Sequence, residues 1–196
     1  MERAGTGQAR PDDQKWICTP APSAWSTNGD PGACCRLVGA GRLGGCGLIV
    51  ICLFDVNTLL AIADSSHVFH EAIHTWLRAN PNVGWATCPL TENGFVRVLC
   101  QPNYRGGPFS ASEAIEALRQ MKEGNPRRHY FWADSVSLTD EAVVRSSRVV
   151  GPQQITDVYL VALAVCQRGQ LVTFDRSVAW QAVVGATSAS VVTPEA

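Results

Sequence analysis

The sequence predicts an α/β domain with a central, mainly parallel sheet, and two observations lead to this prediction. The segment GLIVICLF, residues 47–54, is apolar on both faces, as in a strand buried between two helical layers. Two further strand candidates, GWATCPL at 84–90 and QLVTFD at 170–175, are separated from it by segments with helical periodicity. Strands that alternate with helices of about 10–15 residues are typical of parallel sheets covered on both faces.

Length and composition allow one ordinary domain within the 196 residues, because 46% apolar content is enough for a core. The formal net charge of -1 indicates no general attraction to nucleic acid. Residues 1–47 are rich in Gly, Pro and Ser and lack any sustained period, so we interpret them as a disordered extension or as a stretch upstream of a true start near Val50. Residues 48–196 then form the domain. No stretch resembles a signal peptide or membrane span, which favours the cytoplasm.

The first helices carry recognisable start and stop signals. Ser65 or Ser66 can cap a helix over residues 67–80, whose apolar positions recur every four residues and whose end is followed by Pro81. After the second strand, residues 92–99 follow the i, i+3, i+4, i+7 pattern of another helix. Glu92 therefore falls in a first helical turn.

The same alternation continues to the C-terminus. Ser110 and Glu113 form a capping-box pattern for a helix over residues 111–124. The segment FWADSVSL, 131–138, alternates apolar and polar residues and is predicted to be a strand, and a short helix is expected over 140–150. The clearest helical pattern covers residues 155–169, with Asp157 in the first turn and Gly169 after the end.

Four acidic residues stand at the edges of these apolar segments. Asp55 and Asp175 follow strands, whereas Glu92 and Asp157 lie in first helical turns. In an α/β sheet these positions can open on one edge, where the carboxyl ends of the strands meet. A carboxylate there is costly unless it is paired, hydrogen-bonded or bound to a cation, and oxygen ligands select hard ions such as Mg²⁺ or Mn²⁺. Such an ion activates water for phosphodiester hydrolysis.

These segments resemble a known family, the PIN domains, and within them the VapC-type toxins of bacterial type II toxin-antitoxin systems. The resemblance runs from about Ile51 to Pro194 and rests on FDVNTLLA, HEAIHTWL, TENGFVRVL, FWADSVSL, ITDVYLVALA and LVTFD in this order. It implies a three-layer α/β/α fold and a Mg²⁺- or Mn²⁺-dependent endoribonuclease. It also implies an RNA substrate such as tRNA, a cognate VapB-type antitoxin and a homodimer.

Carried over residue by residue, the resemblance implies that Asp55, Glu92, Asp157 and Asp175 are the catalytic acids. Asp55 and Asp157 are the expected direct metal ligands, Glu92 and Asp175 are further candidates, and Asn57 and Thr156 are supporting polar residues beside two of the acids. The N-terminal 47 residues depart from the family pattern, whose chains begin just before the first strand.

Other basic residues and histidines allow further hypotheses. Arg97, Arg127 and Arg128 are candidate contacts for the RNA backbone, although a short basic run is usually a solvated loop. His67, His70 and His74 have the i, i+3, i+7 spacing of one helix face, which fits a transition-metal site or an ordinary wet or interface face.

Two alternative functions remain open at this stage. One is a non-catalytic PIN-like interaction module with a decayed site. The other is a phosphatase of the haloacid dehalogenase type, because LFDVNTLL is similar to that family's strand and aspartate nucleophile. The second acid of that family is replaced here by Asn57, and only Lys15 and Lys122 can supply its lysine.

Overall fold

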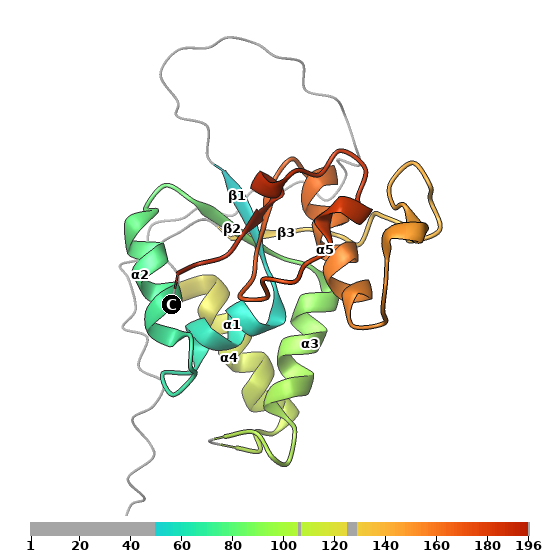
Figure 1. Ribbon diagram of the computed structural model, residues 1–196. Coiled ribbons are helices and arrows are strands. Elements are labelled where there is room, and N and C mark those ends of the chain that lie inside the picture. Colours follow the sequence, from blue (N-terminus) through green and yellow to red (C-terminus); the bar gives the residue numbers. More distant parts are fainter. Residues whose placement is uncertain (1–49, 106, 125–128, 196) are drawn as a thin grey trace, which may run out of the picture.

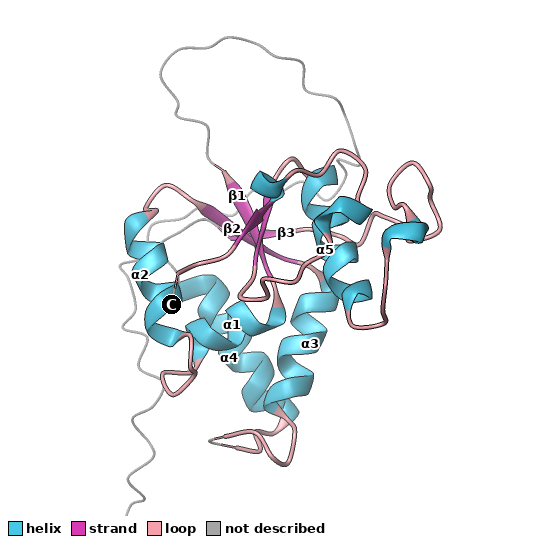
Figure 2. Ribbon diagram, viewed as in Figure 1, coloured by secondary structure: helices cyan, strands magenta, loops and turns pink. Residues whose placement is uncertain are grey.

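A five-stranded parallel sheet with helices on both faces forms the centre of the protein (Figures 1 and 2). The computed structural model describes residues 50–105, 107–124 and 129–195. The sheet has the order β3-β2-β1-β4-β5, and every neighbouring pair is parallel. The strands are β1 (Ile51–Phe54), β2 (Gly84–Thr87), β3 (His129–Phe131), β4 (Gln170–Val172) and β5 (Val191–Val192). This arrangement confirms the predicted α/β/α class.

Within the described residues, five α-helices and three short 3₁₀ helices connect the strands. The α-helices are α1 (Val56–Ala63), α2 (His70–Ala79), α3 (Pro89–Leu99), α4 (Ala111–Gly124) and α5 (Gln154–Cys166). The 3₁₀ helices are η1 (Ser146–Arg148), η2 (Trp180–Ala182) and η3 (Ser188–Ser190). As far as the structure describes the chain, no helix has the length and apolar character needed to cross a bilayer.

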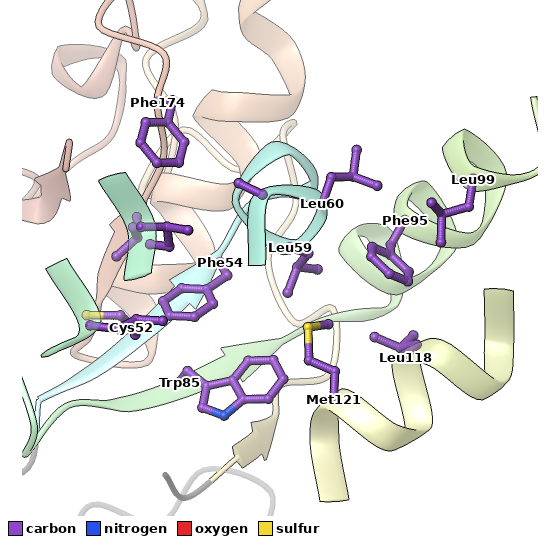
Figure 3. Close-up of a cluster of buried hydrophobic side chains, with 14 of the residues drawn as sticks. Cys52, Phe54, Leu59, Leu60, Trp85, Phe95, Leu99, Leu118, Met121 and Phe174 are labelled. Atoms are coloured by element: carbon purple, nitrogen blue, oxygen red, sulfur yellow. The ribbon is translucent and has the colours of Figure 1, made fainter. Parts of the chain in front are cut away.

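Alternate side chains of each strand enter two separate cores, because successive strand residues point to opposite faces. On one face, Phe54 and Trp85 stack with ring centroids 5.6 Å apart and pack with residues of α1 to α4 (Figure 3). On the other face, Leu53 and Leu171 pack against α5. The two-sided burial explains why residues 51–54 are apolar throughout.

Close packing of α3 on α1 depends on Gly94. An added Cβ there would lie 2.5 Å from a methyl group of Val56, so only glycine allows the two helices this approach. Both helices begin at the carboxyl edge of the sheet, directly after β1 and β2. Their contact therefore sets the relative position of the residues at this edge.

The structure corrects several sequence-based element predictions. Helix α1 was not predicted: it has only eight residues, and Asp55, which caps it, is the single residue between it and β1. The predicted strand 131–138 is wrong beyond residue 131, because β3 is an edge strand and most of residues 133–138 are exposed and pair with no strand. The predicted helix over 140–150 is also wrong: backbone hydrogen bonds join Val143 to Val184 and Arg145 to Ala182, and only η1 is helical.

Candidate functional site

Asp55 lies where β1 ends and α1 begins, at the carboxyl edge of the parallel sheet. Its Oδ1 accepts the backbone N–H of Thr58 at 2.6 Å, so it is the N-cap of α1. The side chain is only 8% exposed. Burial raises the pKa of the Asp55 carboxyl and the charge of Asp175 adds to this effect, whereas hydrogen bonds from Thr173 and Thr58 oppose it.

The start of α1 is fixed against the end of β4, which brings Asp175 to the same place. The Asp55 backbone N–H donates to the Val172 carbonyl at 3.3 Å, and the Thr58 hydroxyl donates to the same oxygen at 3.1 Å. Asp175 follows three residues later. The Ser177 hydroxyl and backbone N–H donate to its Oδ1 at 2.6 and 2.7 Å, and these bonds lower the pKa of the Asp175 carboxyl.

Asp157 approaches these two residues from the opposite layer. It lies in the first turn of α5, the helix that covers the other face of the sheet. Burial raises the pKa of Asp157 to about 6, and the negative charges of Asp175 and Asp55 contribute to the shift. Three of the four predicted acids, from three separate elements, therefore interact electrostatically at one edge of the sheet.

Glu92 belongs to a neighbouring polar network in this structure. It lies in the first turn of α3, as predicted, and its Oε1 accepts hydrogen bonds from the Thr87 hydroxyl at 2.6 Å and from Lys122 Nζ at 2.7 Å. The Thr87 oxygen also lies 2.9 Å from His129 Nε2. Since the single Thr87 proton goes to Glu92, His129 is the donor in the second bond.

The network of Thr87, Glu92, Lys122 and His129 is partly buried and contains one ion pair. Burial and the charge of Lys122 lower the pKa of His129 to about 4, so the ring is neutral near pH 7 with its proton on Nε2. Lys122 is engaged with Glu92 and lies far along the chain from β1. Its use here speaks against the phosphatase alternative, in which a lysine would serve an aspartate nucleophile at Asp55.

The supporting residues are placed unevenly around the three aspartates. Asn57 lies in the first turn of α1, and its Oδ1 accepts a hydrogen bond from His67 Nε2 at 3.1 Å. Thr156 is exposed beside Asp157, and Arg97 is exposed in the last turn of α3 without an ion pair to any described residue. Arg127 and Arg128 lie outside the described residues.

The histidine pattern is interrupted by the true start of α2. His67 lies in the loop before the helix, whereas His70 and His74 lie within α2 with ring centroids 4.3 Å apart. The nitrogens of His70 and His74 face backbone carbonyl oxygens of Ala61 and Ile62. The three histidines are therefore not a metal-binding helix face.

Sequence reasoning missed the residues that hold the acids in place. The most important are Thr87, Lys122 and His129 around Glu92, and Thr173 and Ser177 around Asp55 and Asp175. Ser177 had a local signal, because an Asp followed two residues later by Ser often closes a turn on itself. The contacts with Lys122 and His129 span 30 and 42 residues of sequence and had none.

The donor chemistry of the three aspartates fits a hard divalent cation. Carboxylates that raise one another's pKa are stabilised when a positive charge lies between them. In the described part of the chain, no three His, Cys, Asp or Glu side chains are gathered closely enough to hold an ion by themselves. Mg²⁺ is commonly bound by one or two carboxylates together with several waters, so two of these aspartates would supply enough protein ligands for it.

Comparison with known proteins finds several relatives in Mycobacterium tuberculosis. The chain is 47% identical over 135 residues to "Ribonuclease VapC44", covering 69% of this chain and 93% of that protein. It is 43% identical over 126 residues to "Ribonuclease VapC38", covering 64% and 86%. It is 37% identical over 127 residues to "Ribonuclease VapC29", covering 65% and 87%.

The chain was also compared with protein-family models and with solved structures. No family model matches the chain. A solved structure of VapBC2 from Rickettsia felis bound to a DNA fragment from the promoter aligns with a TM-score of 0.48 at 11% identity, over 74% of this chain and 99% of that one. The similarity to "Ribonuclease VapC44" covers nearly the whole of that protein. This chain therefore belongs to the VapC ribonucleases, the PIN-domain family that its motifs resemble.

Proposed function

We propose that this protein is the toxin of a type II toxin-antitoxin system and acts as a Mg²⁺- or Mn²⁺-dependent endoribonuclease. The observation that carries the proposal is the meeting of Asp55, Asp157 and Asp175 at the carboxyl edge of the sheet, with the pKa of Asp157 raised to about 6. Perturbed carboxyls grouped at such an edge are a common feature of functional sites. Membership of the VapC ribonuclease family supports RNA as the substrate.

The chain's own residues would divide the work as follows. Asp55 and Asp157 hold the cation, which when bound supplies positive charge to the phosphate and lowers the pKa of water. The two hydrogen bonds from Ser177 both go to Oδ1 of Asp175 and fix the orientation of this carboxylate. Its Oδ2 would thus be available to the cation or to a metal-bound water. Glu92 is oriented by Thr87 and Lys122 and serves to position water or substrate beside the aspartates.

Cleavage of purified RNA tests this proposal. The wild-type protein is incubated with total cellular RNA in Mg²⁺, in Mn²⁺ and in EDTA, beside the variants Asp157→Asn and Glu123→Gln. Glu123 is an exposed residue of α4 whose charge does not contribute to the pKa shift of Asp157, so its substitution is a matched loss of one negative charge. We expect metal-dependent cutting by the wild type and Glu123→Gln and loss of at least about 100-fold with Asp157→Asn.

The same experiment separates the remaining alternative. Folded wild-type protein, free of antitoxin, that leaves RNA intact in both metals would favour a non-catalytic interaction module. Equal cutting by Asp157→Asn and the wild type would refute the assignment of Asp157. Cutting that persists in EDTA would refute the metal dependence.

A VapB-type antitoxin and a second copy of the chain are the proposed protein partners. Aliphatic side chains stand exposed on three helices: Leu90 on α3, Ile115 on α4 and Ile155 on α5 are 39%, 46% and 45% exposed. Scattered exposed aliphatic residues are normal, so this support is secondary to family membership. Copurification with the product of the neighbouring gene, and the mass of the isolated toxin in solution, test the two partners separately.

A further inference from the structure

A polar hollow lies between the loop that joins α1 to α2 and the loop that joins α3 to α4. Its volume is about 320 Å³. Six of the residues that line it are Asp64, His67, Gln101, Asn103, Tyr104 and Arg105. A second hollow of about 230 Å³ lies near Val50 and Asn82, before the first residues of β1 and β2. Ligands of parallel α/β sheets bind at the carboxyl ends of the strands, which counts against the second hollow, at their amino ends. The polar hollow is therefore the better candidate site.

One wall of the polar hollow is tied directly to the proposed active site. The Phe69 backbone N–H donates to His67 Nδ1 at 3.2 Å, which places the ring proton of neutral His67 on Nε2. That proton is donated to Asn57 Oδ1 at 3.1 Å. Asn57 lies two residues after Asp55, so His67 and Asn57 would lie between a molecule in the hollow and a phosphate at the aspartates.

A second contact fixes the same loop to Asp175. The Phe69 ring stacks on the Phe174 ring with centroids 4.2 Å apart and planes 5° from parallel. Phe174 directly precedes Asp175 in the chain. Side-chain contacts thus join the loop to Asn57, two residues after Asp55, and to Phe174, directly before Asp175, so the hollow keeps a defined position near both aspartates.

The floor of the hollow joins the two loops. Asp64 is 8% exposed, and its Oδ1 accepts the backbone N–H and the hydroxyl of Ser66 at 2.8 and 2.7 Å. Its Oδ2 accepts the hydroxyl of Tyr104 at 2.9 Å, across 40 residues of sequence. A buried carboxylate with these donors holds both loops at a fixed separation.

The rim offers hydrogen-bonding groups that the fold does not use. Gln101, Asn103 and Arg105 are exposed, and their side chains make no hydrogen bond to any residue that the structure describes. Asn and Gln amides pair with the N6 and N7 edge of adenine, and Arg pairs with the O6 and N7 edge of guanine. Bases of unpaired RNA expose these edges, which is how most sequence-specific RNA recognition works.

We propose that the polar hollow binds an unpaired purine of the RNA substrate, next to the bond that is cut, and thereby determines where the enzyme cleaves. Gln101, Asn103 and Arg105 read the base edge, and His67 is a positioning residue that links the hollow to Asn57. The inference rests on the proposed ribonuclease function and adds to it a site for sequence selection.

Matched substitutions in the two hollows test the inference. Asn103→Ala and Asn82→Ala make the same change at exposed loop positions, the first in the polar hollow and the second in the other hollow. Each variant and Arg105→Ala is given a randomised single-stranded RNA pool in Mg²⁺, and the bases at the cut sites are sequenced. Retention of the uncut pool is measured in EDTA, where no cleavage occurs.

We expect Asn103→Ala and Arg105→Ala to lose the purine preference and to raise KM about tenfold at unchanged kcat, whereas Asn82→Ala behaves as the wild type. Unchanged cut sites and KM in both hollow variants would overturn the inference, as would loss of antitoxin binding without any change toward RNA. The wild type could cut no RNA in Mg²⁺ yet bind purine-containing RNA in EDTA, with Asn103→Ala abolishing this binding. That result would refute the ribonuclease proposal and still support the hollow as an RNA-binding site. Absence of any purine preference in the wild type would overturn the inference itself.

Discussion

Replacing Asp157 with Asn is expected to stabilise the metal-free protein while it abolishes activity. Burial and the charges of Asp175 and Asp55 raise the pKa of Asp157 well above the usual range of an aspartate, to about 6. The folded state therefore holds this proton more tightly than the unfolded chain does. Above about pH 6 the ionised carboxylate destabilises the folded state, because it is partly removed from water and lies near two other negative charges.

The size of the effect follows from two opposing contributions. A shift of about two pKa units corresponds to at most about 3 kcal/mol at 1.36 kcal/mol per unit, and solvent screening lowers this value because the Asp157 side chain is only half-buried. Asp157 also lies in the first turn of α5, where a negative charge stabilises the helix by about 0.3–1 kcal/mol that Asn would lose. The net gain in the free energy of unfolding is then about 2 kcal/mol near neutral pH, or a rise of about 4–8 °C in Tm.

Urea unfolding in EDTA measures this gain as a function of pH. The advantage of Asp157→Asn should be complete above about pH 6, should shrink as pH falls through the window between the two pKa values, and should disappear below about pH 4, where wild-type Asp157 is protonated in both states. Glu123→Gln is the control and should stay within about 0.5 kcal/mol of the wild type. A variant that is equally or less stable than the wild type near pH 7.5 would refute the electrostatic reasoning.

Three further outcomes follow from the packing and the domain boundary. Thr87→Val removes a buried hydroxyl with two hydrogen bonds and should lower the free energy of unfolding by about 2 kcal/mol, whereas Thr139→Val at the surface should leave it nearly unchanged. Equal denaturation midpoints for the two variants would contradict the role of the Thr87 hydroxyl. Gly169→Ala should lower the free energy of unfolding by about 1–3 kcal/mol because its Cβ would collide with a backbone carbonyl oxygen, whereas Gly124→Ala, with no atom of a described residue within 4 Å of its Cβ, should be neutral or stabilising by up to about 1 kcal/mol. Thermal unfolding that ranks the two variants in the reverse order would contradict this difference in packing. A chain that begins at Val50 should unfold at the same urea concentration as the full chain, since we propose that residues 48–196 form the domain; a lower midpoint would place part of the upstream segment in the folded unit.

Gly169 illustrates how a correct sequence prediction can rest on a different physical cause. Its place after α5 predicted a helix end, and α5 does end at Cys166. The residue with positive φ at this end is Arg168, at 56°, and Gly169 is needed because Ile51 and Trp132 leave no space for a side chain. The stop signal was local, whereas the steric reason comes from β1 and from the residue after β3.

The sequence by itself determined the class of fold and the identity of the acidic residues. Apolar runs and helical periods depend on neighbours in the chain. The parallel sheet, four of the α-helices, the place of Asp55 after a strand and the places of Glu92 and Asp157 in first helical turns could therefore be predicted. Helix α1 was not predicted because its eight residues are too few to show a clear helical period and only Asp55 separates it from β1. The strand predicted over 131–138 was wrong beyond residue 131, because alternation of apolar and polar residues does not ensure that a partner strand is present.

Only the tertiary structure decided which of these acids act on one another. Asp55, Asp157 and Asp175 interact because the parallel register places the ends of β1 and β4 side by side and α5 covers them from the other face. Glu92 instead pairs with Lys122, and His67 joins Asn57 to the polar hollow. Burial, the charge of distant residues and the contact of two loops arise from packing between segments far apart in the chain, and local sequence carries no record of them.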